Sequence, residues 1–453
     1  MKKIISFRKT DTQRIFVCAF FFVSIFVSIF SGCFVISNHY TKVAPGLWRA
    51  VLQLTPSQVT PNKKGAPLPE KMNLKFDEAT SGELPFTLNI EYINDTTVTA
   101  TIINGDEKIK CEAEDIKIGH NRANGQDTIR IDFPVYGTFI RAVYRERVME
   151  GEWVKPASNS SIPFIAHQGD DHRFTTLSKA PMLDISGKWA TVFFGKDSSK
   201  YNAIGEFVQK GNILNGTFRT ETGDYRFLSG EVQGDKIYLS CFDGSHAFLF
   251  EGKINVDGTI FGFFRSSKNE PEYWEAKRDS NFQLRDANAI SGSKVGNAPI
   301  NFSYNDAKGK KIALTDYGKK VKIVQIMGTW CPNCRDETNF LTNYLKNNKS
   351  DNLAIIALAF ERNKEIATTQ LETYKKKMNV PYDILLAGTT TNKDSTSNAL
   401  PFLNDFEGYP TMIFLDKNNV IRRVHTGFDG PATSRYAGFE KEFDEFTKSL
   451  IKE

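Results

Sequence analysis

Two patterns of apolar and polar residues divide the chain. From about residue 46 to residue 279, short runs rich in Phe, Tyr, Val, Ile and Thr alternate with polar residues and end at Gly, Asn or Asp. Examples are Tyr225–Gly234, Lys236–Cys241 and His246–Gly252. A period of two with frequent turn residues indicates β-strands, and no run in this part of the sequence keeps a helical period. This region is therefore predicted to be all-β.

The β region also repeats itself. Each copy opens with a Gly-x-Trp motif, carries a Gly-Asp turn before a cysteine, and closes with a Gly and a Trp 16 residues apart. The matching positions are Trp48 and Trp189, Cys111 and Cys241, and the closing pairs Gly137–Trp153 and Gly258–Trp274. Internal duplication predicts two related domains, which we place at residues 46–156 and 187–279. Seven or eight short antiparallel strands in each would form a small barrel or a sandwich.

Individual residues of this region have mainly structural interpretations. The Gly-x-Trp opening resembles that of lipocalin- and avidin-type barrels, and we expect the tryptophans to pack in the core, with a ligand pocket as the alternative. Cys111 and Cys241 occupy equivalent places in separate domains, so two buried free thiols are favoured over a disulfide between the copies. His246 lies in an apolar run and is interpreted as a core histidine rather than a metal ligand.

The last third of the chain has a different pattern. A polar segment, residues 280–296, serves as a linker. From 297 to 453, apolar runs alternate with amphipathic segments of 12 to 16 residues, which predicts an α/β layered sheet. The predicted strands are Val321–Met327, Leu353–Phe360, Tyr382–Ala387, Pro410–Leu415 and Val420–His425. The predicted helices follow the Cys pair to Leu345, cover Lys364–Met378, and end the chain at Tyr436–Ile451.

Candidate chemistry is concentrated in Cys331-Pro332-Asn333-Cys334, where a buried strand meets a predicted helix. Free N–H groups and the dipole at a helix N-terminus favour a thiolate, and three residues of separation place Cys334 on the same helix face. Cys331 is then the nucleophile and Cys334 the resolving thiol of thiol–disulfide exchange. A zinc ribbon would need a second Cys or His pair, and a c-type haem would need His at Arg335. A purely structural disulfide would close too short a loop to constrain much of the chain.

The motif Trp330-Cys331-Pro332-Asn333-Cys334, with Glu337 and with Tyr409-Pro410-Thr411 before a strand, resembles the thioredoxin superfamily and, more closely, exported TlpA-type thiol:disulfide reductases. The resemblance covers about residues 290–453. It implies that Pro410 is a cis-proline facing the cysteines, and that Trp330, Pro332, Tyr409 and Pro410 line a substrate groove. Glu337 would exchange a proton with the buried thiol, and the alternative is a solvated helix carboxylate. Asn333 stands where this family often has Pro, which leaves the direction of electron flow open.

The N-terminus carries an export signal. Residues 1–32 hold five Lys or Arg against one acid, and the formal charge of +5 falls to +1 without them. This basic segment precedes the apolar run Ile15–Phe30, as in a secretory signal. Phe30-Ser31-Gly32-Cys33 resembles the lipobox of bacterial lipoproteins, which implies a signal peptide at 1–32, a lipid on Cys33 and a tether at 33–45. An uncleaved anchor, Ile15–Ile36, is the alternative. In either case the rest of the chain lies in the cell envelope, facing the periplasm.

The sequence therefore predicts a multidomain protein, with a duplicated all-β region and a thioredoxin-like domain, that acts as a membrane-tethered thiol:disulfide oxidoreductase and most simply as a reductase. Expected partners are protein or small thiol and disulfide substrates and a membrane electron donor, with no cofactor, metal or nucleic acid. One alternative is a ligand- or partner-binding lipoprotein with an accessory thioredoxin-like domain. Another is a peroxiredoxin-like peroxidase, whose P-x-x-x-T/S-x-x-C motif would need Pro and Thr or Ser where Val324 and Gly328 stand. The β region is expected to hold the redox domain away from the membrane and to offer a docking surface.

Overall fold

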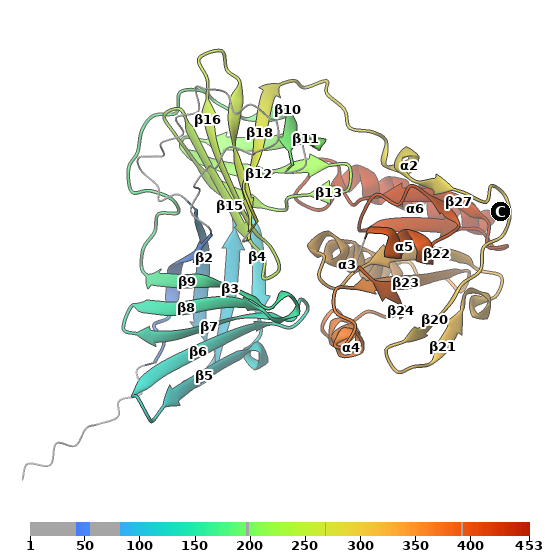
Figure 1. Cartoon of the computed structure of the whole chain (residues 1–453), viewed down its shortest axis with the longest axis horizontal. Helices are drawn as coiled ribbons and strands as arrows, with labels where there is room; N and C mark the ends of the chain where they lie inside the picture. Colours follow the sequence, from blue (N-terminus) through green and yellow to red (C-terminus); the bar gives the residue numbers. More distant parts are fainter. Residues whose placement is uncertain (1–41, 55–81, 196–198, 268, 391–392) are drawn as a thin grey trace, which may run out of the picture. The chain divides into compact units, whose positions relative to one another are not determined.

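The computed structural model describes residues 42–54, 82–195, 199–267, 269–390 and 393–453. The expected signal segment and Cys33 lie outside the described residues. Within them, residues 43–453 form one unit. None of the helices in the described ranges combines the length and apolar character needed to cross a membrane. Figure 1 colours the first β domain blue to teal, the second green to yellow, and the redox domain gold to red.

The first β domain is a nine-stranded antiparallel sheet in the order β4-β3-β2-β1-β9-β8-β7-β6-β5. Its strands alternate buried and exposed side chains, as the period of two predicts. Trp48 and Trp153 are fully buried in its core. The strands are β1 (Gly46–Gln53), β2 (Glu83–Tyr92), β3 (Val98–Asn104), β4 (Glu107–Cys111), β5 (Ile116–Asn121), β6 (Gln126–Phe133), β7 (Thr138–Arg145), β8 (Val148–Lys155) and β9 (Ser160–Gln168).

The second β domain closes into a barrel, because β11 pairs with both β10 and β12. Its sheet order is β11-β10-β18-β17-β16-β15-β14-β12-β13. Trp189, Trp274 and several phenylalanines fill the interior. The strands are β10 (Gly187–Phe194), β11 (Lys200–Lys210), β12 (Ile213–Thr220), β13 (Gly223–Asp224), β14 (Leu228–Gln233), β15 (Lys236–Phe242), β16 (Ala247–Ile254), β17 (Ile260–Ser266) and β18 (Glu272–Arg278).

The boundary expected at residue 156 is wrong. Strand β9 continues the first sheet and pairs with both β1 and β8, so this domain extends to Gln168. Pairing with β1 satisfies an edge that would otherwise be open. The two β domains also share a core, since the Phe242 ring lies 4.6 Å from that of Phe86 and 4.9 Å from that of Trp153. Cys111 and Cys241 are both buried and free, as the sequence favoured.

Residues 280–296 were expected to be only a linker, but part of this segment is ordered against the redox domain. It contains the short helix α2 (Ala287–Ile290) and the strand β19 (Gly292–Ser293), which pairs with β25 (Leu403–Asn404). Ser291 Oγ donates to the carbonyl of Asp405 at 2.8 Å. These bonds fix the entry of the chain into the redox domain.

The redox domain is built on a mixed seven-stranded sheet in the order β21-β20-β24-β23-β22-β26-β27. Strands β22, β23 and β24 are parallel to one another, and β26 and β27 form an antiparallel hairpin. The strands are β20 (Ser303–Asp306), β21 (Lys311–Ala313), β22 (Val321–Met327), β23 (Leu353–Glu361), β24 (Asp383–Thr389), β26 (Thr411–Leu415) and β27 (Ile421–Thr426). The helices are α3 (Pro332–Asn347), α4 (Ala367–Lys377), α5 (Lys393–Ala399) and α6 (Tyr436–Lys452).

Apolar layers cover both faces of this sheet. On one face α3, α4 and α6 pack against alternate residues of the central strands, including Ile323 and Phe414. On the other face the segments around Phe302 and Phe402 pack against Val324 and Ile356. Because both faces are covered, every residue of β22 is buried, including Lys322 and Gln325 in its mostly apolar run. The chain leaves the buried strand β22 at Met327 and reaches the Cys pair at the N-terminus of α3.

Candidate active site

The Cys331–Cys334 pair lies at the junction between β22 and α3. Cys331 is the residue that caps the N-terminus of α3, and Pro332 occupies the first helical position, where its missing N–H costs no hydrogen bond. The Cys331 and Cys334 sulfurs form a disulfide, with Cα atoms 5.2 Å apart. Cys331 Sγ also accepts the Cys334 N–H at 3.2 Å. This donor and the helix dipole both stabilise negative charge on Cys331 when the disulfide is reduced.

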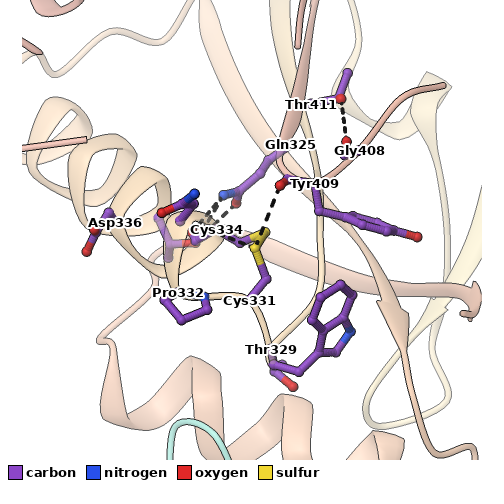
Figure 2. Close-up of a disulfide and its surroundings, with 12 residues drawn as sticks. Gln325, Thr329, Cys331, Pro332, Cys334, Asp336, Gly408, Tyr409 and Thr411 are labelled. Atoms are coloured by element: carbon purple, nitrogen blue, oxygen red, sulfur yellow. Dashed lines mark hydrogen bonds between the residues drawn. A yellow bond between two sulfur atoms is a disulfide. The ribbon is translucent and has the colours of Figure 1, made fainter. Parts of the chain in front are cut away.

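A second loop faces the disulfide from across the site. The Tyr409–Pro410 peptide bond is cis, as the resemblance implied. The Tyr409 carbonyl oxygen lies 3.9 Å from Cys331 Sγ, and Figure 2 marks this approach with a dashed line. The Pro410 carbonyl accepts the Gly427 N–H at 2.9 Å, which ties this loop to the end of β27. The disulfide and the backbone next to Pro410 are therefore brought together.

Trp330 forms one wall beside the pair. Its Nε1 donates to the Phe360 carbonyl at 2.9 Å, and its ring lies 5.3 Å from the Tyr409 ring in an edge-on arrangement. The guanidinium of Arg362 stacks over the indole at 4.0 Å. These contacts hold the indole close to Tyr409, so two of the residues expected in a substrate groove lie side by side.

Glu337 is buried in the core of the redox domain rather than solvated, so the structure does not support the interpretation as a solvated carboxylate. It lies on α3, three residues after Cys334, and neither of its carboxylate oxygens has a hydrogen-bond partner among the described residues. Burial raises the pKa of Glu337 to about 8. At neutral pH this carboxyl is mostly protonated.

A buried polar network supports the first turn of α3, and sequence reasoning missed it. Gln325 Nε2 donates to the carbonyl of Cys334 at 3.2 Å and to Thr338 Oγ1 at 3.1 Å. Thr338 Oγ1 accepts the Tyr374 hydroxyl at 3.0 Å, and Gln325 Oε1 accepts the Tyr382 hydroxyl at 3.3 Å. The available signal was a glutamine inside the mostly apolar run of β22, a residue that needs partners when buried.

Glu361 is a second residue that sequence reasoning missed. Its carboxylate accepts the Thr329 N–H at 2.9 Å and the Thr329 hydroxyl at 2.7 Å, and the group is buried. Burial raises the pKa of Glu361 above its ordinary value, while the two Thr329 donors act in the opposite direction. Glu361 fixes the backbone just before Trp330 and Cys331, so it is a positioning residue. Its signal was an acid directly after an apolar strand.

Comparison with known proteins finds a family model that matches part of the redox domain. The family model described as AhpC/TSA family matches residues 295–424. Thioredoxin-like protein YneN of Bacillus subtilis (strain 168) is 26% identical over 136 residues, which is 30% of this chain and 74% of that protein. Thiol-disulfide oxidoreductase ResA of the same organism is 26% identical over 135 residues, which is 30% of this chain and 68% of that protein.

A solved structure from Chlorobium tepidum TLS, a thiol:disulfide interchange protein of the thioredoxin family, is 20% identical. The match covers 35% of this chain and 99% of the Chlorobium tepidum chain, with a TM-score of 0.28. The α/β sheet, the Cys pair at a helix N-terminus and the named sequence relatives together define the C-terminal domain as a thioredoxin-like thiol-disulfide oxidoreductase. Those relatives are not named as peroxidases, so the peroxiredoxin alternative is not favoured.

Proposed function

We propose that the protein is an envelope-tethered thiol:disulfide reductase of the TlpA type, in which Cys331 attacks and Cys334 resolves. The observation that carries this proposal is the Cys331–Cys334 disulfide at the N-terminus of α3, opposite the Tyr409 carbonyl. Substrates are protein or small-molecule disulfides. A membrane dithiol serves as the electron donor that regenerates the reduced pair.

The reaction proceeds in two exchanges that conserve electrons. The Cys331 thiolate attacks one sulfur of the substrate disulfide, forming a mixed disulfide and releasing the first substrate thiolate. Cys334 then loses its proton and attacks Cys331 Sγ, which forms the internal disulfide and releases the second substrate thiolate. Two electrons pass from the Cys pair to the substrate, and both released thiolates take up protons.

Glu337 is the proposed proton acceptor for Cys334, a role that falls to the fraction of molecules in which its carboxyl is ionised, a minority at neutral pH. A carboxyl with a pKa of about 8 in an apolar setting is close in proton affinity to a thiol, so a proton passes between the two at little cost. When the donor reduces the internal disulfide, the same carboxyl returns the proton to the departing Cys334 sulfur. Trp330, Pro332, Tyr409 and Pro410 form the groove that orients the substrate disulfide beside Cys331.

The tether is proposed from the sequence of the leader. A basic segment, an apolar run and the Phe30-Ser31-Gly32-Cys33 motif support cleavage before Cys33 and attachment of lipid there. The mass of the mature N-terminus tests this assignment. A lipid-modified Cys33 is expected, and an intact Met1 would contradict it.

Duplication of the β domains is also a proposal. Trp48 Nε1 donates to the carbonyl of Ala44 at 3.0 Å, and Trp189 Nε1 donates to that of Ile185 at 2.8 Å, four residues upstream in both cases. The closing tryptophans differ in place, since the strand of Trp274 pairs with β10 while β9 separates the strand of Trp153 from β1. Common descent with one strand gained or lost accounts for both facts.

Trapping of mixed disulfides tests the proposed chemistry. Cys334→Ser removes the resolving thiol, so this variant is expected to accumulate covalent adducts with its substrates, visible on non-reducing gels and lost on reduction. Cys331→Ser is expected to trap none. Cys111→Ala serves as a control because Cys111 is buried and free. Equal adduct levels in the Cys331 and Cys334 variants would overturn the assignment of roles.

A further inference from the structure

One turn of the second β domain lies against the active site. Strands β12 and β13 form a hairpin in which Thr220 pairs with Gly223, and we call residues 221–224 the hairpin turn. The turn is braced internally, since Thr220 Oγ1 donates to the Gly223 carbonyl at 2.8 Å and accepts the Thr222 N–H at 3.3 Å. It therefore has a defined shape of its own.

The hairpin turn contacts the residues between the two cysteines. Asn333 Nδ2 donates to the carbonyl of Asp224 at 3.2 Å. A Cβ atom at Gly223 would lie only 2.0 Å from Asn333 Nδ2, so any larger residue at this position would displace the Asn333 amide. The second β domain thus makes direct contact with the Cys-Pro-Asn-Cys loop.

The same turn contacts the loop of the cis-proline and the loop after β27. A Cβ atom at Gly408 would lie 3.0 Å from Thr222 Cγ2, and one at Gly427 would lie 2.8 Å from the carbonyl oxygen of Glu221. Both glycines therefore make room for the turn. Gly408 lies beside Tyr409 on the far side of the disulfide from α3 (Figure 2). The turn is in contact with three loops of the redox domain: the Cys-Pro-Asn-Cys loop, the cis-proline loop and the loop after β27.

Polar anchors flank these contacts. The Asp224 carboxylate accepts the Gly430 N–H at 2.9 Å, and Ser245 Oγ donates to the carbonyl of Trp330 at 2.9 Å. Each bond joins the second β domain to a loop of the redox domain. The hairpin turn is held by directed hydrogen bonds as well as by shape.

Arg226, two residues past the turn, is the central anchor. Its side chain is 2% exposed and makes ion pairs with Glu107, Asp243 and Asp336, which belong to the first β domain, the second β domain and α3 respectively. A buried guanidinium is stable only when carboxylates compensate its charge. If Asp336 were lost, Arg226 would still pair with Glu107 and Asp243 in the β region. The ion pair with Asp336 can therefore break without leaving the Arg226 charge uncompensated.

With the turn in this position, Cys331 is 6% exposed. The loops that the hairpin turn covers are those that carry the proposed groove residues Trp330, Pro332, Tyr409 and Pro410. The turn itself contains no sulfur, so it cannot enter the exchange reaction. A folded protein disulfide, whose sulfurs are surrounded by bulky chain, cannot reach Cys331 while the turn is in place.

We propose that the hairpin turn is a built-in lid on the substrate groove, which admits small or extended disulfides and excludes folded proteins until the turn is displaced. This inference rests on the proposed reductase function and adds a selection of substrates by size. Asn333, Gly408 and Gly427 are the positions on the redox domain that accept the lid, and Arg226 with Asp336 is its anchor.

The test compares two disulfides in the reduced full chain: 2-hydroxyethyl disulfide as the small substrate and insulin as the protein substrate. The double variant Thr222→Gly with Ser245→Ala weakens the contacts that the second β domain makes with the redox domain. The single variant Asp336→Asn removes the carboxylate of the redox domain that pairs with Arg226. Asp351→Asn, an exposed acid of the same domain, is the matched control. Because the two variants change different domains, the test still works if one of them fails to fold. Thermal unfolding shows whether each variant is folded.

A closed lid lowers the fraction of molecules whose groove can take a protein disulfide. Loosening the lid is therefore expected to raise the ratio of the insulin reduction rate to the small-disulfide reduction rate about tenfold in both variants. The control variant should keep the wild-type ratio. The small-disulfide rate is expected to stay within about twofold, since that substrate passes the lid. An unchanged ratio in folded variants would overturn the lid. Failure of the wild type to react with the small disulfide would instead overturn the proposed reductase function.

Discussion

Glu337 combines an ionisable group with an environment that disfavours its charge. Its pKa is raised to about 8 by burial, against an ordinary value of 4.5. Between these two pH values the folded protein holds a proton that the unfolded chain has released. Stability due to this group therefore falls as pH rises from 4.5 to 8, which is the reverse of the effect of a salt-bridged acid.

Glu337→Gln is expected to remove this pH dependence. The variant should gain on the order of 1–3 kcal/mol in free energy of unfolding relative to wild type between pH 5 and pH 8 in the oxidised state. Denaturant unfolding at several pH values measures the difference. Glu372→Gln, an exposed acid on α4, is the control and should leave the wild-type slope unchanged. Parallel stability curves for wild type and the Glu337 variant would contradict the assigned pKa.

At the level of single residues, sequence reasoning located the Cys pair and the cis-proline but not the groups that support them. The Cys pair, Glu337, Trp330 and the cis-proline are local signals, because each follows from spacing or from an established motif. Gln325 and Glu361 gave weaker signals, since their roles depend on partners such as Thr338 and Thr329, which only the folded sheet brings close.

Elements with an unambiguous period were predicted closely. The mostly apolar run at Val321–Met327 matches β22, and the amphipathic stretch at the C-terminus matches α6. Strand β9 was missed because its alternation begins after a polar turn at Pro156–Ser158 that has the composition of a domain end. The pairing of β9 with β1 joins strands that are far apart in the sequence. The pattern of apolar and polar residues within one strand does not show which other strand it pairs with.

Two glycines provide a contrast between helix and barrel. Gly438 lies on the exposed face of α6, with no atom within 4 Å of an added Cβ, so Gly438→Ala should raise the free energy of unfolding by about 0.5–1 kcal/mol. An added Cβ at Gly262 in β17 would lie 1.9 Å from the Glu251 carbonyl oxygen. Gly262→Ala is therefore expected to destabilise the barrel, and thermal unfolding of both variants measures the signs. A stabilised Gly262 variant would contradict the close strand pairing.

The three regions of the described chain are joined by more contacts than a flexible linker implies. Gln370 of α4 donates to the Val135 carbonyl of the first β domain at 2.8 Å, and Lys377 pairs with Asp115 at 2.6 Å. Because the hairpin turn also bonds to Asn333 and Gly430, both β domains contact the redox domain. This arrangement fits a β region that regulates access better than one that serves only as a spacer.

Contacts of this kind could not be predicted from the sequence. The bond from Asn333 to Asp224 joins positions 109 residues apart, and the Arg226 ion pair with Asp336 spans 110. In the sequence, Asn333 stood out only as a departure from the family's Pro, and the β region was predicted to hold the redox domain away from the membrane and to offer a docking surface. Only the folded chain brings Thr222 and Glu221 of the second β domain next to Gly408 and Gly427 of the redox domain.

The central claim is that Cys331 begins a two-electron exchange that Cys334 completes. The most direct measurement is the number of free thiols per full chain after the reduced protein reacts with 2-hydroxyethyl disulfide, counted by alkylation and mass spectrometry under denaturing conditions. Wild type should lose two thiols per chain, at Cys331 and Cys334, while Cys331→Ser loses none at a comparable rate. Oxidation of the Cys331→Ser variant at the wild-type rate would contradict the account.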